Sequence, residues 1–131
     1  MNELAKEILD TVEVGALATV NVDRTPLVTP LHFARLGDSI VWISEPTARH
    51  SENAFRNGKA EFVVWDDKKR AVFLKTNVTE LPESEKEAAM AAYKEKLDDF
   101  MPRCQNPQIY VAPIGELDEK TTTGNWLHFI A

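Results

Sequence analysis

Several features that define common protein classes are scarce or missing in this sequence. The chain has one cysteine, Cys104, so it cannot form an internal disulfide, and this fits a reducing compartment. No stretch is apolar for long enough to cross a bilayer, and Glu3, Lys6 and Glu7 interrupt the apolar residues at the N-terminus. We therefore expect a cytoplasmic protein with neither a membrane span nor a signal peptide.

An excess of basic residues is also missing. The formal net charge of the 131 residues is −6, whereas binding to nucleic acid by counterion release needs clustered Lys and Arg. We therefore do not expect nucleic acid as a partner. The length allows one compact core, so we expect a single domain over residues 1–131.

Familiar catalytic and metal motifs are absent as well. The sequence has no GxGxxG after its first apolar run, no GxxxxGK[ST] and no HExxH. Its histidines, His32, His50 and His128, are too scattered to propose a metal site. No serine lies in a nucleophile elbow, so the sequence names no catalytic side chain.

Alternating and β-branched segments separated by turn residues predict seven short strands. The segment ALATVNV alternates before the turn DRT, and SIVWIS follows the turn LGDS. The predicted strands are residues 16–22, 26–34, 39–44, 60–66, 70–79, 108–115 and 125–130.

Helical patterns occur only at the connections between these strands. Residues 2–11 predict an amphipathic helix that ends before Gly15, and residues 47–57 predict a helix capped by Thr47 and ended by Gly58. The segment between Pro82 and Pro102, rich in Ala, Glu and Lys, predicts the longest helix. The predicted fold is all-β with peripheral helices, a closed or nearly closed antiparallel barrel, because closure removes exposed strand edges.

The segment from Ser44 to Asn53 joins a predicted strand to a predicted helix and has the composition of an anion site. Free N–H groups at a helix start favour a phosphate, and the hydroxyls of Ser44 and Thr47 with the cation of Arg49 complete the pattern. The alternative is an ordinary capped helix with an exposed arginine.

The succession GALATVNVDRTPLVTPLHFARLGDSIVWIS, followed by ARHSENAFRNGKAEFVVWDD, resembles the pyridoxamine 5′-phosphate oxidase-like family of FMN-binding split barrels. The likeness covers residues 15–67, and it lies in the order of the segments rather than in one motif. The resemblance implies an antiparallel split barrel of six to seven strands that works as a homodimer. It also implies FMN in a groove at the dimer interface.

Carried over by position, the resemblance assigns cofactor-binding residues. Ser44, Arg49 and His50 would contact the phosphate, although His50 stands where relatives often have lysine. The residues along the flavin ring would be Val28, Thr29, Pro30 and Leu31. Trp126, in GNWLHF, is similar to the aromatic residue that relatives contribute from the second subunit.

The function that the resemblance implies is an FMN-dependent oxidoreductase acting on an unidentified small molecule. The tail lacks the Arg- and His-containing pattern of a true pyridoxamine-phosphate oxidase. The main alternative is a non-catalytic flavin- or haem-binding protein, a stress or sensor module, in which His50 or His32 ligates haem. A deazaflavin enzyme and a barrel without cofactor are further alternatives.

Overall fold

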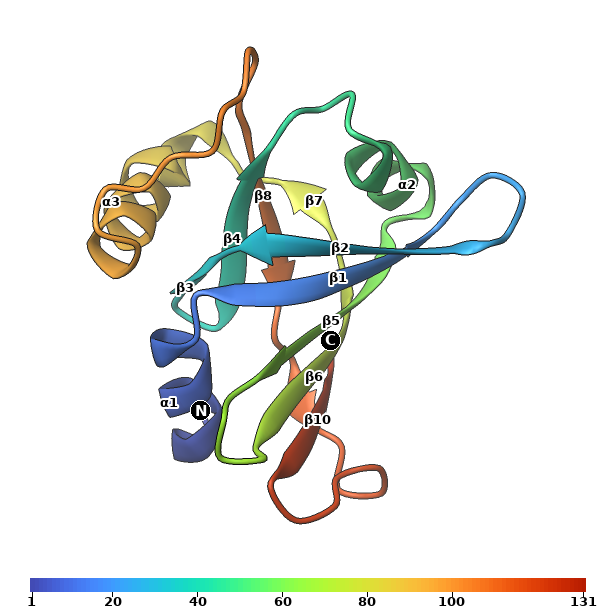
Figure 1. Cartoon of the computed structure of the whole chain (residues 1–131), viewed down its shortest axis with the longest axis vertical. Helices are drawn as coiled ribbons and strands as arrows, with labels where there is room; N and C mark the ends of the chain where they lie inside the picture. Colours follow the sequence, from blue (N-terminus) through green and yellow to red (C-terminus); the bar gives the residue numbers. More distant parts are fainter.

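The computed structural model describes residues 1–131, and its strands form two β-sheets with helices around them (Figure 1). All seven predicted strands are present. They are β1 (Val14–Val20), β2 (Pro26–His32), β4 (Ser39–Ser44), β5 (Lys59–Trp65), β6 (Ala71–Asn77), β8 (Gln108–Pro113) and β10 (Trp126–Ile130). Three short strands were not predicted: β3 (Ala34–Leu36), β7 (Thr79–Glu80) and β9 (Glu116–Leu117).

The strands form a split barrel rather than a closed one. One sheet has the order β2-β1-β5-β6-β10-β9 and the other the order β3-β4-β8-β7. Every pair is antiparallel except β10 with β6, which is parallel. This exception corrects the expectation of a fully antiparallel fold. It arises because residues 78–125 pass through the second sheet before β10 returns, and a crossover of that length permits parallel pairing.

All three predicted helices are present, and each begins or ends differently from the expectation. α1 (Glu3–Thr11) is capped by Asn2 and stops at Thr11, so Gly15 does not end it. Gly15 lies inside β1, where a Cβ would overlap the ring of Phe62. Glycine is required there because a neighbouring strand packs an aromatic ring directly against the backbone.

α2 (Arg49–Asn57) ends at Gly58, which adopts φ 74° as the sequence predicts. Its N-cap is Ala48, so the prediction of a Thr47 cap is wrong. α3 (Lys86–Lys96) follows a short 3-10 turn (Glu83–Glu85) and is shorter than predicted. It stops because Asp98 and Asp99 take left-handed conformations that turn the chain away.

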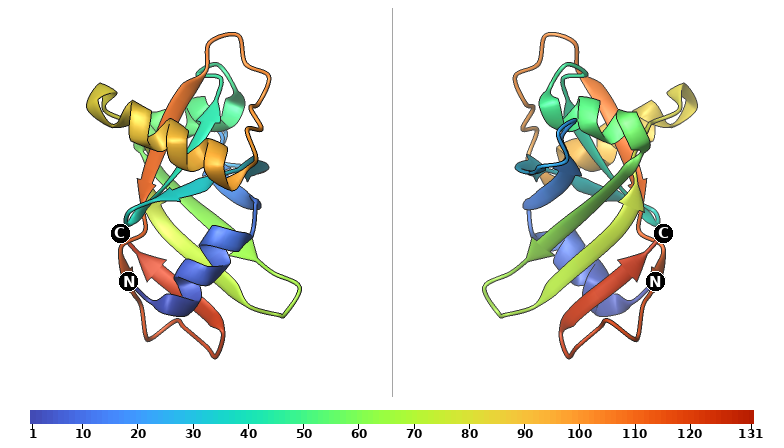
Figure 2. Two further views of the ribbon diagram at one scale, coloured as in Figure 1. Left: turned by 90° about the vertical axis from the view of Figure 1, so that its left-hand side faces the viewer. Right: turned by 90° about the vertical axis from the view of Figure 1, so that its right-hand side faces the viewer.

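The main core lies between α1, the inner face of the six-stranded sheet and β4–β8. It is built around five large side chains, Phe33, Trp42, Phe62, Leu74 and Tyr110, and a smaller cluster lies under α3. In the right-hand view of Figure 2, α1 lies behind β5, β6 and β10, and no helix lies in front of them. No helix therefore covers the outer face of these three strands. None of the helices has the length and apolar character that a membrane crossing needs.

Candidate functional site

The connection between β4 and α2 carries the residues predicted to bind a phosphate. Ser44 ends β4 and is buried, and its hydroxyl lies 3.0 Å from Nε2 of His50 in the first turn of α2. The structure therefore brings two of the three predicted phosphate residues into direct contact. Burial lowers the pKa of His50, so its imidazole is neutral at neutral pH and lacks a full positive charge.

The first turn of α2 has unused backbone donors. Ala48 precedes the helix and offers no side-chain acceptor. The N–H groups of Arg49 and His50 have no hydrogen-bond partner, as is usual for the first residues of an uncapped helix. Because the positive end of the helix dipole lies at the same place, this helix start is suited to an anion.

Arg49 lies beside this pair without joining it. Its side chain lines a hollow of about 460 Å³ between α2 and the turn from β1 to β2, and neither Ser44 nor His50 lines that hollow. Hydrogen bonds from Thr25, together with the charge of Arg49, hold the pKa of Asp23 below its ordinary value, so Asp23 is an anionic neighbour of Arg49. The full lining is Asn21, Val22, Asp23, Thr25, Arg49, Glu52, Asn53 and Arg56.

A polar network that sequence reasoning missed fixes one wall of this hollow. The Asn53 side-chain amide donates to Oγ1 of Thr19 at 3.2 Å and to Oδ1 of Asn21 at 2.9 Å. Arg56 donates to Oδ1 of Asn53 at 2.7 Å and to the carbonyl of Val20 at 2.9 Å. The signal in the sequence is Asn53 itself, because asparagine is a poor helix former and is buried only where it finds partners.

Three further buried polar atoms near the β4–α2 connection have no partner. They are Oγ of Ser51, Oε1 of Gln108 and the hydroxyl of Tyr110. Gln108 pairs with Ser44 across the β4–β8 ladder, and Ser51 follows His50 in α2. Buried polar atoms are normally satisfied by protein or by bound water. The hydroxyls of Ser51 and Tyr110 are close enough to pair with each other, so Oε1 of Gln108 is the buried atom here that bound water or a polar ligand would have to satisfy.

The residues predicted along a flavin ring alternate between two faces of β2. Leu31 is 8% exposed and belongs to the core, and Thr29 shares its face because it pairs with the buried Leu17. Val28, which is 64% exposed, and Pro30 are on the opposite, outer face. Val28 and Pro30 can therefore offer side chains to a ring on the outer face, whereas Thr29 and Leu31 can offer only their backbone.

Trp126 begins β10, which lies at the opposite end of the six-stranded sheet from α2 (Figure 1). It is 53% exposed, and its Nε1 donates to the carbonyl of Lys69 at 3.3 Å. It lines a hollow of about 560 Å³ together with Val63, Trp65, Asp66, Asp67, Lys69, Arg70, Ala71 and Phe73. Within one chain Trp126 is thus separate from Ser44 and Arg49, and it can share a site with them only across two subunits.

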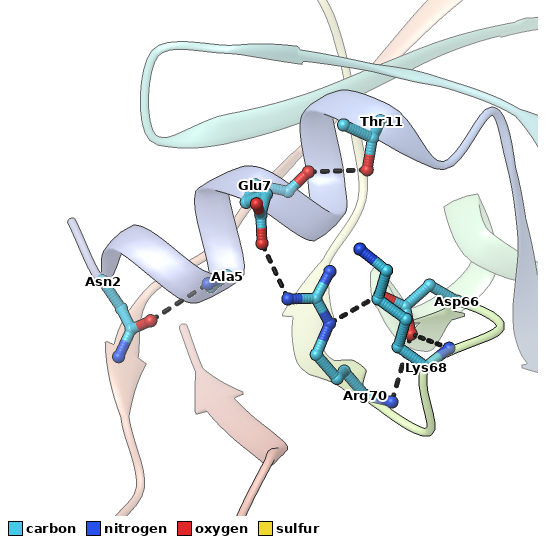
Figure 3. Close-up of polar contacts among 7 residues, drawn as sticks. All are labelled: Asn2, Ala5, Glu7, Thr11, Asp66, Lys68 and Arg70. Atoms are coloured by element: carbon cyan, nitrogen blue, oxygen red, sulfur yellow. Dashed lines mark hydrogen bonds and ion pairs between the residues drawn. The ribbon is translucent and has the colours of Figure 1, made fainter.

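The β5–β6 turn that forms one wall of this second hollow is held by α1. Arg70 donates to Oδ2 of Asp66 at 2.7 Å and to Oε2 of Glu7 on α1 at 2.7 Å (Figure 3). Asp66 also accepts hydrogen bonds from the backbone N–H groups of Lys68 and Arg70. These bonds fix the turn whose Lys69 carbonyl orients Trp126.

The fold defines a split barrel, and comparison with known proteins agrees with that class. The sequence model of the family described as pyridoxamine 5′-phosphate oxidase matches residues 1–115. The chain therefore belongs to this family. No curated protein sequence matches the chain.

Solved structures with the same fold have diverse printed descriptions. A heme binding protein from Mycobacterium smegmatis is 20% identical with a TM-score of 0.73, and the match covers 86% of this chain and 50% of that one. An FAD-binding protein from Mesorhizobium loti is 20% identical, with a TM-score of 0.68 and coverage of 88% and 91%. The heme storage protein HutZ from Vibrio cholerae is 15% identical, with a TM-score of 0.68 and coverage of 86% and 88%. The chain spans half the length of the mycobacterial protein, and at these identities the likeness shows the fold alone.

Proposed function

We propose that the chain binds FMN and acts as an FMN-dependent oxidoreductase on a small molecule. The observation that carries this proposal is the uncapped start of α2 beside the Ser44–His50 pair. Two free backbone donors, a hydroxyl and a helix dipole at one place match the needs of a phosphate ester. Because the chain belongs to the pyridoxamine 5′-phosphate oxidase family, we take this phosphate ester to be that of a flavin.

The phosphate would be held by the N–H groups of Arg49 and His50 and by the hydroxyl of Ser44. The guanidinium of Arg49 would add positive charge by turning from its hollow toward the helix start. The ring would lie against Val28 and Pro30 on the outer face of β2. When bound, FMN supplies hydride or electron transfer, and the chain's own residues orient it and limit the access of water.

A homodimer is part of this proposal because the outer face of the six-stranded sheet carries several large apolar side chains at its surface. Val28, Trp65, Trp126 and Ile130 are each about half exposed or more on this face, which they share with Lys59, Glu61 and Lys75. Exposed apolar side chains gathered on one face often mark an interaction site. A second copy on this face would cover it and would bring its own Trp126 toward the first copy's α2.

Haem binding without turnover is the second candidate. His32 favours it, because its ring forms no hydrogen bond and lies at the outer face of β2, tilted against the Phe100 ring with centroids 4.2 Å apart. Nε2 of His50, by contrast, is already engaged by Ser44. The mycobacterial and Vibrio proteins that share the fold are described as binding or storing heme.

A visible spectrum of the purified protein, recorded before and after addition of FMN or haem and desalting, separates these functions. Retained flavin bands that bleach with NADH or NADPH and return in air support the oxidoreductase. Retained flavin without bleaching supports the non-catalytic flavin protein, and retention of haem alone supports the second candidate. A protein that stays colourless with both ligands would contradict both proposals.

Arg49→Ala tests the phosphate end of the flavin site. Loss of one charge-assisted contact should weaken FMN binding roughly tenfold or more, measured by flavin fluorescence. Riboflavin, which lacks the phosphate, should bind the variant and the parent protein equally well. Lys6→Ala removes an exposed cation from α1 and should change neither affinity. Equal FMN affinity in Arg49→Ala and the parent would mean that Arg49 does not bind the phosphate.

A further inference from the structure

Residues 98–107, here called the strap, connect α3 to β8 without a helix or strand. The strap is anchored where it begins. Nζ of Lys96, the last residue of α3, donates to the carbonyls of Leu9 at 2.8 Å and Phe33 at 3.0 Å. The same ammonium lies 3.6 Å from the centroid of the Phe33 ring. Because Phe33 directly follows β2, this anchor fixes the beginning of the strap to the end of that strand.

The strap is also anchored at its other end. The Glu45 carboxylate accepts hydrogen bonds from the backbone N–H groups of Gln105 and Asn106, the latter at 3.1 Å to Oε1. Glu45 directly follows Ser44 at the end of β4. The two anchors therefore belong to the strand proposed to carry the flavin ring and to the connection proposed to carry its phosphate.

Between the anchors the strap holds two large apolar side chains at the surface. Asp98 and Asp99, at φ 53° and 62°, turn the chain so that the Phe100 ring lies 4.2 Å from the ring of His32. Phe100 nevertheless remains 41% exposed, and the adjacent Met101 remains 38% exposed. Neither side chain belongs to the core under α3, and the contact of Phe100 with His32 leaves a large part of its ring open.

The position of His32 on β2 shows which surface these side chains border. His32 shares the outer face with Val28 and Pro30, because alternate residues of a strand point to the same side. Their pairing partners on β1 include Ala16 and Ala18, whose small side chains leave a shallow floor beside this row. Phe100 stands at the end of the floor nearest His32, and Met101 follows it in the strap.

We propose that Phe100 and Met101 form a wall of the flavin site and contact the isoalloxazine ring where it lies on the outer face of β2. This inference rests on the flavin function proposed above. An aromatic ring and a thioether are suited to a flat apolar ligand. The strap then determines which ring fits, whereas the start of α2 determines that the ligand carries a phosphate.

The test is a comparison of FMN and riboflavin affinities in the intact protein. Phe100→Ala should weaken both ligands by a similar factor, roughly five- to tenfold, because both carry the ring. Phe100→Leu should recover part of the loss. Iodide should quench the bound flavin more strongly in Phe100→Ala, because the wall that shields the ring has been removed. Thermal unfolding should show that this exposed position leaves the fold intact.

Phe55→Ala is the matched control, since Phe55 is also about half exposed but its ring lies against Tyr110. It should change neither affinity by more than about twofold. If the parent protein binds neither FMN nor riboflavin, the proposed function fails and this inference fails with it. If the parent binds both and Phe100→Ala keeps the same affinities and iodide quenching, the flavin function stands and the wall is wrong.

Discussion

The first turns of α1 and α2 satisfy their backbones in opposite ways. Oδ1 of Asn2 accepts a hydrogen bond from the N–H of Ala5 at 3.0 Å, whereas Ala48 offers α2 no side-chain acceptor. Both N-cap residues have extended backbones, with ψ of 125° and 144°, so a capping side chain would fit at either position. The difference lies in residue type alone. The N–H groups of the first two residues lack partners in both helices, and only α1 has a side chain that accepts from its first turn.

α2 is stabilised by its second half instead. Gly58 ends the helix in a left-handed conformation, and its N–H donates to the carbonyl of Ala54. Asn53 and Arg56 bind β1 and the turn that follows it. A helix held in this way can leave its first turn open without fraying, which is the requirement for a preformed anion site.

Among the variants that test this comparison, Asn53→Ala should have the largest effect on the free energy of unfolding. It leaves the Thr19 hydroxyl, the Asn21 amide and the Arg56 guanidinium short of partners, so we expect a loss of about 3 kcal/mol in the free energy of unfolding. Asn2→Ala, which removes only a cap from α1, should lose about 1 kcal/mol. Urea unfolding of both variants measures the difference. Equal losses would mean that the Asn53 network does not hold α2.

Ala48→Asp sharpens the comparison by giving α2 the kind of cap that α1 has. The new carboxylate should accept from the first turn and raise the free energy of unfolding by about 1 kcal/mol. The same carboxylate occupies the free donors and repels a phosphate, so FMN affinity should fall at least about tenfold. Opposite changes in stability and affinity from one substitution are the signature of an open helix start.

Ala48→Asn separates the two causes in that result. Asparagine caps as well as aspartate does but adds no charge, so occupancy of the donors alone should weaken FMN binding by a smaller factor. Unchanged FMN affinity in both variants would place the phosphate elsewhere. A loss in Ala48→Asp alone would assign the effect to charge repulsion rather than to the backbone donors.

The seven longer strands could be predicted from the sequence because each is short, alternating or β-branched, and bounded by turn residues. Gly15 could not be interpreted correctly in that way. A glycine after a helical segment looks like a helix end, and only the packing of Phe62 from a neighbouring strand shows why no Cβ fits. The parallel pairing of β10 with β6 depends on a similarly distant return of the chain.

The candidate site likewise has features that follow from local sequence and features that depend on distant contacts. The contact between Ser44 and His50 follows from their closeness in sequence, since a strand end and the first turn of the next helix must lie together. The side on which Arg49 lies, the two faces of β2 and the strap that reaches His32 all depend on contacts between distant segments. Local patterns carry no information on such contacts, and the homodimer and the place of Trp126 within it remain predictions.

Thr47→Ala should have the smallest effect, and it tests local pattern against structure directly. A hydroxyl residue two positions before α2 resembles an N-cap in the sequence. Removal of a true threonine cap would lower the free energy of unfolding by roughly 1 kcal/mol. In the structure the N-cap is Ala48, and the exposed Thr47 side chain makes no hydrogen bond. We therefore expect the free energy of unfolding to change by less than about 0.5 kcal/mol, and FMN affinity to stay the same. A loss near that of Asn2→Ala in parallel urea titrations would show that α2 is capped after all, and the two helix starts would then no longer differ.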